Sequence, residues 1–126
     1  MANKRRYDVT MERRVATRVS VDIYNLCKEG GEKLTPALLP GTFARNMADE
    51  ALKALRANDL PPEAPPPYYR DMNLMLPPHI ADAIDALVKV ARRKEKRVGP
   101  GVILRRLIWM GLQRRGLAAK KMKLVS

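Results

Sequence analysis

Six side chains at alternate positions of two short segments carry groups that suit the recognition of base edges. They are Arg14, Ala16, Arg18, Asp71, Asn73 and Met75. In the major groove of DNA, arginine pairs with guanine, asparagine pairs with adenine, aspartate accepts from cytosine, and methionine can touch the thymine methyl group. Alanine offers almost nothing to this chemistry. Recognition works only if the six positions share one exposed surface, so it depends on the elements that carry them.

The two segments alternate between apolar and polar residues, as expected for strands with one buried face. The predicted strands are residues 15–19 and 72–76, and their buried set is Val15, Thr17, Val19, Met72, Leu74 and Leu76. A single short strand leaves its backbone groups without partners, so we expect the two to pair as an antiparallel ribbon. A two-stranded ribbon fits the major groove with its polar face toward the bases.

A sequence repeat predicts two similar helices. The pattern Pro-Gly-x-apolar-apolar-Arg begins at Pro40 and again, 60 residues later, at Pro100. Proline is favoured at the first helical position, where its missing N–H costs nothing. The apolar residues that follow recur at helical spacing. The order strand, helix, helix is therefore expected twice.

Another helix is expected between each strand and the helix that begins with proline. The second half shows one apolar stripe at helical spacing, formed by Ile80, Ile84, Leu87, Val88 and Ala91. In the first half, Gly30 and Gly31 are expected to cut this helix short, because glycine is a poor helix former. The segment is also three residues longer in the second half, so the halves are not equivalent and a symmetric target is not required.

Proline separates the two halves. Five of the seven residues from 61 to 67 are proline, which favours a stiff, extended linker of roughly 35–40 Å. We therefore expect a basic N-terminal arm at 1–12, a first repeat at 13–55, a linker at 56–68, a second repeat at 69–116 and a basic tail at 117–126.

The charge of the chain predicts the class of its partner. Among 126 residues there are 25 Lys and Arg against 13 Asp and Glu, a net charge of +12, of which residues 68–126 carry +10. Such a surplus predicts nucleic acid or an anionic membrane surface as partner. No apolar run approaches the ~18–20 residues of a membrane helix, and the first residues do not form a signal peptide. We therefore expect a cytoplasmic, nucleoid-associated protein without a membrane partner.

The sequence does not favour an enzyme. Cys27 is its one cysteine and His79 its one histidine, which argues against a disulfide framework, a cysteine-based zinc site and a Ser-His-Asp triad. We expect no catalytic residue, metal or cofactor. Cys27 falls on an apolar position and is expected in the core, whereas Trp109 could pack in the core or against a partner chain.

The second half of the chain resembles a known family. Residues 70–80 read Arg-Asp-Met-Asn-Leu-Met-Leu-Pro-Pro-His-Ile, and an amphipathic helix and the Pro100-Gly101 helix follow. This order resembles the ribbon-helix-helix (Arc/MetJ/CopG-type) DNA-binding family, and residues 13–55 resemble it more weakly. The resemblance implies a mainly α fold with a short two-stranded antiparallel ribbon. Because both copies lie in one chain, it implies a tandem, single-chain pseudo-dimer, as in two-repeat accessory proteins of conjugative plasmids.

The resemblance also implies which residues contact DNA. Its groove-reading positions correspond to the six outward residues. Its phosphate site, at the first amides of the second helix, corresponds to Gly41, Thr42, Gly101 and Val102. Anion binding there is also expected physically, because first-turn N–H groups are unpaired and the helix dipole is positive. Further predicted phosphate contacts are Lys4, Arg5, Arg6, Arg13 and Arg70.

We therefore expect sequence-specific binding of double-stranded DNA, most simply by a transcriptional repressor, with copies of the chain forming homo-oligomers on adjacent sites. A plasmid relaxosome or partition accessory protein is one alternative. An antitoxin-type regulator with a protein partner is another, although the short basic tails do not support it. A basic protein that coats RNA or an anionic membrane would bind unrelated sequences equally. Asp71 opposes attraction to DNA unless it reads a cytosine or points aside.

Overall fold

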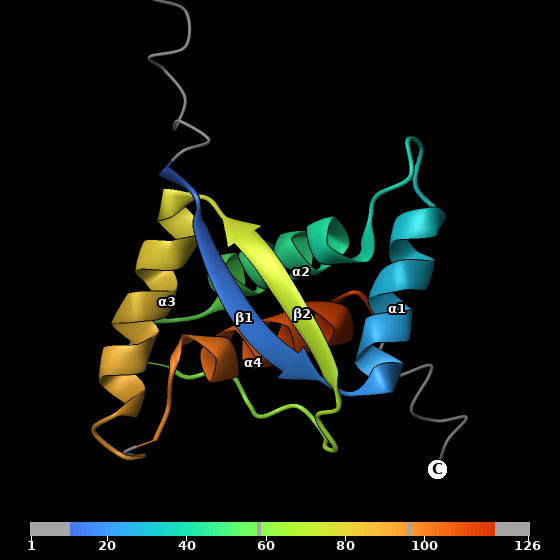
Figure 1. Cartoon of the computed structure of the whole chain (residues 1–126). Helices are drawn as coiled ribbons and strands as arrows, with labels where there is room; N and C mark the ends of the chain where they lie inside the picture. Colours follow the sequence, from blue (N-terminus) through green and yellow to red (C-terminus); the bar gives the residue numbers. More distant parts are fainter. Residues whose placement is uncertain (1–10, 58, 96, 118–126) are drawn as a thin grey trace, which may run out of the picture.

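The computed structural model describes residues 11–57, 59–95 and 97–117. Within these ranges the chain is a mixed α/β structure with four helices and a two-stranded antiparallel sheet (Figure 1). In chain order the elements are β1 (Arg13–Val19), α1 (Val21–Glu32), α2 (Pro40–Ala54), β2 (Arg70–Leu76), α3 (Pro78–Ala91) and α4 (Pro100–Arg114). The order of strand, helix and helix occurs twice, which confirms the prediction.

The two strands pair with each other along their whole length. Arg13 lies opposite Leu76, and Ala16 lies opposite Asn73 at the centre of the antiparallel ribbon. All six residues expected on the inner face are at most 6% exposed. The predicted ribbon and its buried face are therefore confirmed, and both strands come from the same chain.

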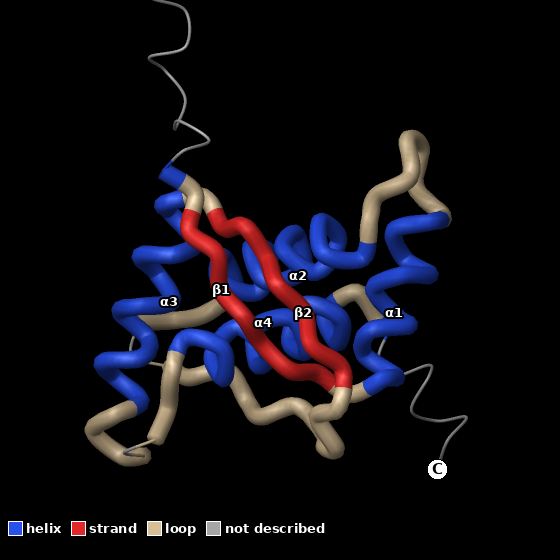
Figure 2. Tube along the Cα trace, in the orientation of Figure 1, coloured by secondary structure: helices blue, strands red, loops and turns tan. Residues whose placement is uncertain are grey.

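The helices lie behind and beside the ribbon. Figure 2 shows the two strands crossing in front of α2 and α4, with α1 and α3 at the sides. The helices α2 and α4 begin at Pro40 and Pro100, as expected, and pack against each other. A Cβ atom added at Gly111 of α4 would lie 2.2 Å from the Met47 carbonyl oxygen of α2. The close crossing of α2 and α4 therefore depends on glycine at this position.

Two residues singled out in the sequence belong to the core. Cys27 is fully buried, as expected, and burial raises the pKa of its thiol to about 12. Trp109 is also buried and is part of the same apolar core. Packing within the chain therefore accounts for both side chains.

The first helix passes through the two glycines that are expected to cut it short, although at 12 residues it is shorter than α3 with 14. Helix α1 continues through Gly30 and Gly31 and ends at Glu32. A Cβ atom at Gly30 would lie 2.5 Å from the Phe43 ring, and one at Gly31 would lie 2.4 Å from the Leu38 carbonyl oxygen. The glycines thus admit the next segment of the chain against α1. We attribute the continuation of the helix to this packing, which offsets the roughly 1 kcal/mol that each glycine costs in helix propensity.

The proline-rich linker packs against the body of the protein. The described residues between α2 and β2 form no helix or strand, yet Pro61 and Ala64 are buried. The Tyr68 hydroxyl donates to the Ala64 carbonyl oxygen, and the carboxylate of Glu63 accepts from Arg105 of α4. These contacts hold the linker against the body of the protein.

Candidate nucleic-acid interface

The six predicted recognition positions lie together on the outer face of the ribbon. The exposed residues are Arg14, Ala16 and Arg18 of β1, and Asp71, Asn73 and Met75 of β2. They share a face because side chains alternate across a strand and because the register sets the two polar rows side by side. We call this surface the ribbon face.

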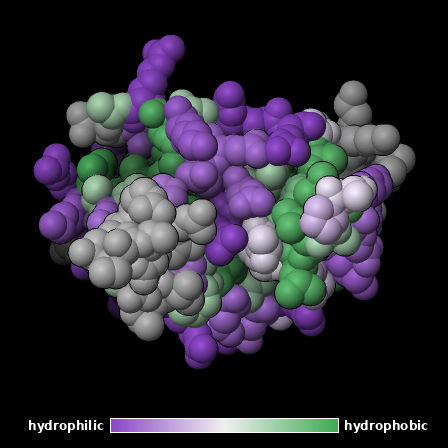
Figure 3. All heavy atoms as spheres, turned by 90° about the horizontal axis from the view of Figure 1, so that it is seen from above, coloured by the Kyte–Doolittle hydropathy of each residue, from purple (hydrophilic) through white to green (hydrophobic). Residues whose placement is uncertain are grey.

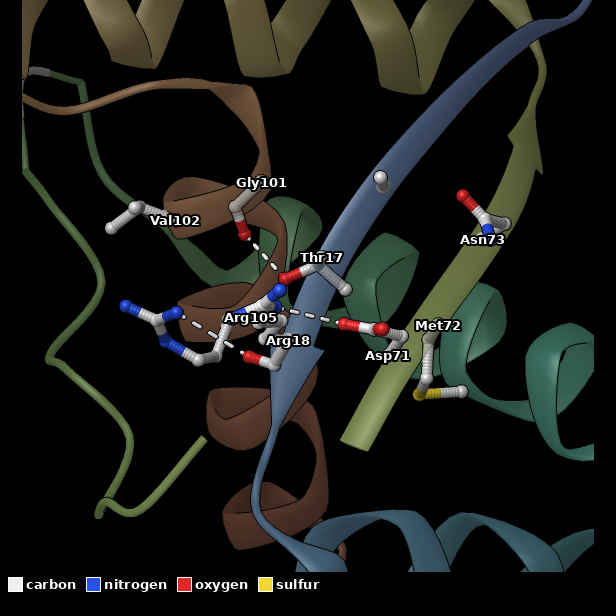
Figure 4. Close-up of a pocket in the computed structure, with 9 residues that line it drawn as sticks. Thr17, Arg18, Asp71, Met72, Asn73, Gly101, Val102 and Arg105 are labelled. Atoms are coloured by element: carbon white, nitrogen blue, oxygen red, sulfur yellow. Dashed lines mark hydrogen bonds and ion pairs between the residues drawn. The ribbon is translucent and has the colours of Figure 1, made fainter. Parts of the chain in front are cut away.

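An ion pair crosses the ribbon face. Arg18 and Asp71 lie directly opposite each other, and Arg18 Nε donates to Asp71 Oδ1 at 2.9 Å. Figure 4 shows the two side chains pointing toward each other. Sequence reasoning gave Asp71 two roles, as a reader of cytosine or as a side chain turned aside. The structure adds a third, because Asp71 partners an arginine of its own chain.

Two hollows flank the ribbon, one beside the start of α4 and one beside the start of α2. The hollow beside α4, of about 480 Å³, is lined by both strands and by Gly101, Val102 and Arg105 (Figure 4). The hollow beside α2, of about 340 Å³, lies between β2 and residues that include Gly41 and Thr42. The four positions at the helix starts that are predicted to bind phosphate therefore all lie next to the ribbon.

The helix starts at these hollows keep backbone donors available. Unlike α1, which is capped by Ser20, neither α2 nor α4 has a side-chain cap. Within the described part of the chain, the N–H groups of Gly41, Thr42 and Gly101 have no acceptor, whereas Val102 N–H donates to the Gly99 carbonyl at 3.2 Å. Unpaired first-turn amides and the helix dipole together favour an anion.

The start of α4 is pressed closely onto β1. Thr17 is a buried polar residue, and its hydroxyl donates to the Gly101 carbonyl oxygen at 2.6 Å. A Cβ atom at Gly101 would lie 2.4 Å from the Ala16 carbonyl oxygen, whereas one at Gly41 would meet nothing within 4 Å. The two helix starts therefore differ: the start of α4 is fixed to the ribbon, and the start of α2 is more open.

Arg13 and Arg70, at the starts of the two strands, are held by the opposite half of the chain. Arg13 forms two hydrogen bonds with Asp85 of α3, at 2.8 and 2.9 Å. The hydrogen bond from Arg13 lowers the pKa of Asp85. Arg70 lies over the ring of Tyr24 of α1, 4.0 Å from its centre. Asp85 offsets much of the charge of Arg13, whereas no described acidic side chain forms an ion pair with Arg70.

Sequence reasoning missed a cluster around Glu63. Arg105, whose side chain is only 11% exposed, donates to both carboxylate oxygens of Glu63, at 2.9 and 2.8 Å, and lies 3.7 Å from the centre of the Tyr68 ring. Arg106 is also buried and contacts Glu63 and Glu95. The available signal was a lone acidic residue among prolines and two adjacent arginines in an apolar helix.

The remaining basic residues are one predicted base-reading residue, three predicted phosphate contacts and one arginine that the sequence analysis did not single out. Arg14 forms no ion pair with any residue that the structure describes. Lys4, Arg5 and Arg6 lie outside the described residues. Arg45, which follows Gly41 as Arg105 follows Gly101, is 4.0 Å from a carboxylate oxygen of Glu12.

The face of the molecule that lies uppermost in Figure 1 is mostly polar. Figure 3 shows hydrophilic residues over much of the face seen from above, with apolar residues in smaller patches between them. Leu39 is 75% exposed and Met75 is 41% exposed, and both line the hollow beside α2. These two side chains supply apolar contact area next to the open amides of α2.

Comparisons with known proteins do not assign a family. No family model, curated protein or solved structure matches the chain. Among the described residues, no three His, Cys, Asp or Glu side chains are grouped to hold a metal ion. No described helix combines the length and apolar character needed to cross a bilayer. The candidate site therefore rests on the geometry and charge of the ribbon face and the two helix starts.

Proposed function

We propose that this chain binds double-stranded DNA in a sequence-specific manner by inserting its ribbon into the major groove. In this proposal the two halves form a tandem ribbon-helix-helix pseudo-dimer within one polypeptide. The observation that carries it is the exposed ribbon face flanked on both sides by uncapped helix starts. Repression of transcription, by occupying a promoter, is the simplest role for such a protein.

The arrangement matches the layout of a DNA groove. A major groove is bordered by two phosphate backbones and admits a two-stranded ribbon. With the ribbon in the groove, the amides at Gly41 and Thr42 would face one backbone and the amide at Gly101 the other. Phosphate contacts supply most of the affinity, and the side chains on the ribbon face supply the preference for sequence.

The net charge of +12 supports the same partner. The arginines on the ribbon face do not contribute equally, because Arg18 is paired with Asp71, whereas Arg14 forms no ion pair with a described residue. Arg14 and Asn73 thus have their donors open on the ribbon face, while Arg18 is partly engaged. Arginine and asparagine are both able to recognise a purine by paired hydrogen bonds, arginine on guanine and asparagine on adenine.

The proposal is tested by selecting bound duplexes from a random pool and then measuring affinity for the selected and scrambled sequences. The variant Arg14→Ala with Arg18→Ala is expected to lose the preference for the selected sequence while keeping its circular dichroism and thermal stability. The control, Arg93→Ala with Arg114→Ala, removes two exposed arginines outside the ribbon. It should bind both sequences more weakly but keep their ratio. An unchanged ratio in the ribbon variant would contradict the proposal.

A further inference from the structure

The cross-strand ion pair uses only part of the hydrogen-bonding capacity of Arg18 and Asp71. Arg18 engages Asp71 through Nε alone, so its Nη1 and Nη2 donors and the second oxygen of Asp71 have no partner among the described residues. The two side chains are 70% and 71% exposed. The pair therefore presents a two-donor edge and a carboxylate oxygen side by side on the ribbon face.

Stability does not explain the pair. Exposed ion pairs contribute at most about 1 kcal/mol and often less, and a carboxylate on a surface that meets DNA weakens its attraction to phosphate. A hydrogen bond to Nε, however, restricts the plane of a guanidinium and directs the Nη edge outward. A directed guanidinium loses less freedom when it forms two hydrogen bonds than a flexible one does.

We infer that Arg18 and Asp71 act as one recognition unit for guanine with a neighbouring cytosine, an inference that rests on the proposed function. Arg18 donates from Nη1 and Nη2 to guanine O6 and N7, and the free oxygen of Asp71 accepts from the cytosine amino group. Asp71 is thus a positioning and specificity-determining residue. A thymine at the cytosine position is disfavoured, because its O4 acceptor would face the carboxylate.

The two ends of the ribbon face differ in the residue that lies opposite the arginine. The strand starts and the first helices of the two halves are offset by 57 residues, so Asp71 occupies in β2 the position that Arg14 occupies in β1. Arg14 lies opposite Met75, an uncharged residue, and no carboxylate of the described residues pairs with it. The guanine requirement is therefore expected at one end of the target, and the target is asymmetric.

The test compares the motifs that the native chain and two variants select from a random duplex pool. Asp71→Asn keeps the shape of the side chain but removes its charge. We expect this variant to lose about tenfold in its preference for the guanine at one end of the motif, and to lose its preference for the neighbouring cytosine as well, within the range for a paired contact. Its affinity for unrelated duplexes should be equal or higher. Asp59→Asn removes the same charge from an exposed position in the linker and should leave every position of the motif unchanged.

Arg18→Lys tests whether Arg18 is the residue that reads the guanine, since lysine cannot direct two donors in a fixed plane. This variant should lose the preference for guanine that Asp71→Asn also loses. A native motif that Asp71→Asn leaves unchanged overturns the inference alone. A native chain that selects no motif overturns the proposed function and the inference with it. Thermal unfolding of each variant shows that a changed motif does not come from a damaged fold.

Discussion

Glu63 is the residue whose role depends most on distant parts of the chain. It contacts two arginines of α4 whose side chains are only 11% and 9% exposed. Removing one partner of a buried charge pair is costly, because the remaining charge is left without compensation. A carboxylate in the linker is therefore part of what holds the linker, α4 and the end of β1 together, since Arg105 also donates to the Arg18 carbonyl oxygen at 3.3 Å.

Glu63→Gln is expected to lower the free energy of unfolding by about 2 kcal/mol, the scale for leaving a charged hydrogen-bonding partner unsatisfied. Urea unfolding followed by circular dichroism measures the change. Glu95→Gln is a matched control, because Glu95 contacts Arg106 alone and is half exposed. It should cost less than about 1 kcal/mol. Equal losses in the two variants would show that Glu63 has no special structural role.

The pH dependence of stability follows from the same residue. Partial burial acts to raise the pKa of Glu63, but hydrogen bonds from Arg105 and the Ala64 N–H outweigh it and lower the pKa. The folded chain then binds fewer protons than the unfolded chain. The stabilisation is complete above the ordinary glutamate pKa of about 4.3 and is lost as the pH falls through the lowered value. Stability should therefore fall less steeply below about pH 4.3 in Glu63→Gln than in the native chain. Identical slopes would contradict this assignment.

At the scale of elements, local patterns predicted most of what the structure contains. Alternation in the two strands predicted which side chains are buried, and the Pro-Gly repeats predicted where α2 and α4 begin. The end of α1 and the docking of the linker were not predicted. Both depend on contacts with residues distant in sequence, such as Phe43 against Gly30 and Arg105 against Glu63. Local propensity does not contain this information.

The two helix starts provide a matched pair of glycine substitutions. Gly101→Ala is expected to lower the free energy of unfolding by about 2 kcal/mol, because its methyl group would collide with the Ala16 carbonyl oxygen. Gly41→Ala has open space and should be neutral or stabilising by roughly 0.5–1 kcal/mol. Urea unfolding of both variants gives the comparison. If Gly101→Ala were as stable as Gly41→Ala, the close approach of α4 to β1 would be wrong.

At the scale of the whole molecule, the two halves complete each other. Each strand finds its only partner strand, within the described residues, in the other half. The first residue of each strand is held by the first helix of the other half, through the contacts of Arg13 with Asp85 and of Arg70 with Tyr24. One half alone would expose the apolar face of its strand and leave that strand unpaired.

A fragment of residues 68–126 should therefore be unfolded or form a homodimer in which two copies of β2 pair. Circular dichroism reports whether it folds, and sedimentation equilibrium reports its mass. The intact chain, measured under the same conditions, is the control. A folded, monomeric fragment would contradict the interlocked arrangement of the halves.

The sequence predicted which residues make up the ribbon face, but not which of these residues pair with each other. Period-two alternation was enough to place the six recognition positions on one face. It could not show that Arg18 is paired and Arg14 is not, because that difference depends on which residue lies opposite each of them across the ribbon. Only the register, with Arg18 opposite Asp71 and Arg14 opposite Met75, separates the two arginines.

Cross-linking from the centre of the ribbon face tests the central claim most directly. Cys27 is fully buried with a raised thiol pKa, so a cysteine introduced by Ala16→Cys can be labelled selectively with a photoactivatable cross-linker. A second labelled variant, Gln113→Cys, places the same group at an exposed position near the far end of α4. We expect the label at position 16 to cross-link to bases in the major groove of a selected duplex, and the label at position 113 not to do so. Cross-links from position 113 alone, or from neither position while the duplex is bound, would contradict it.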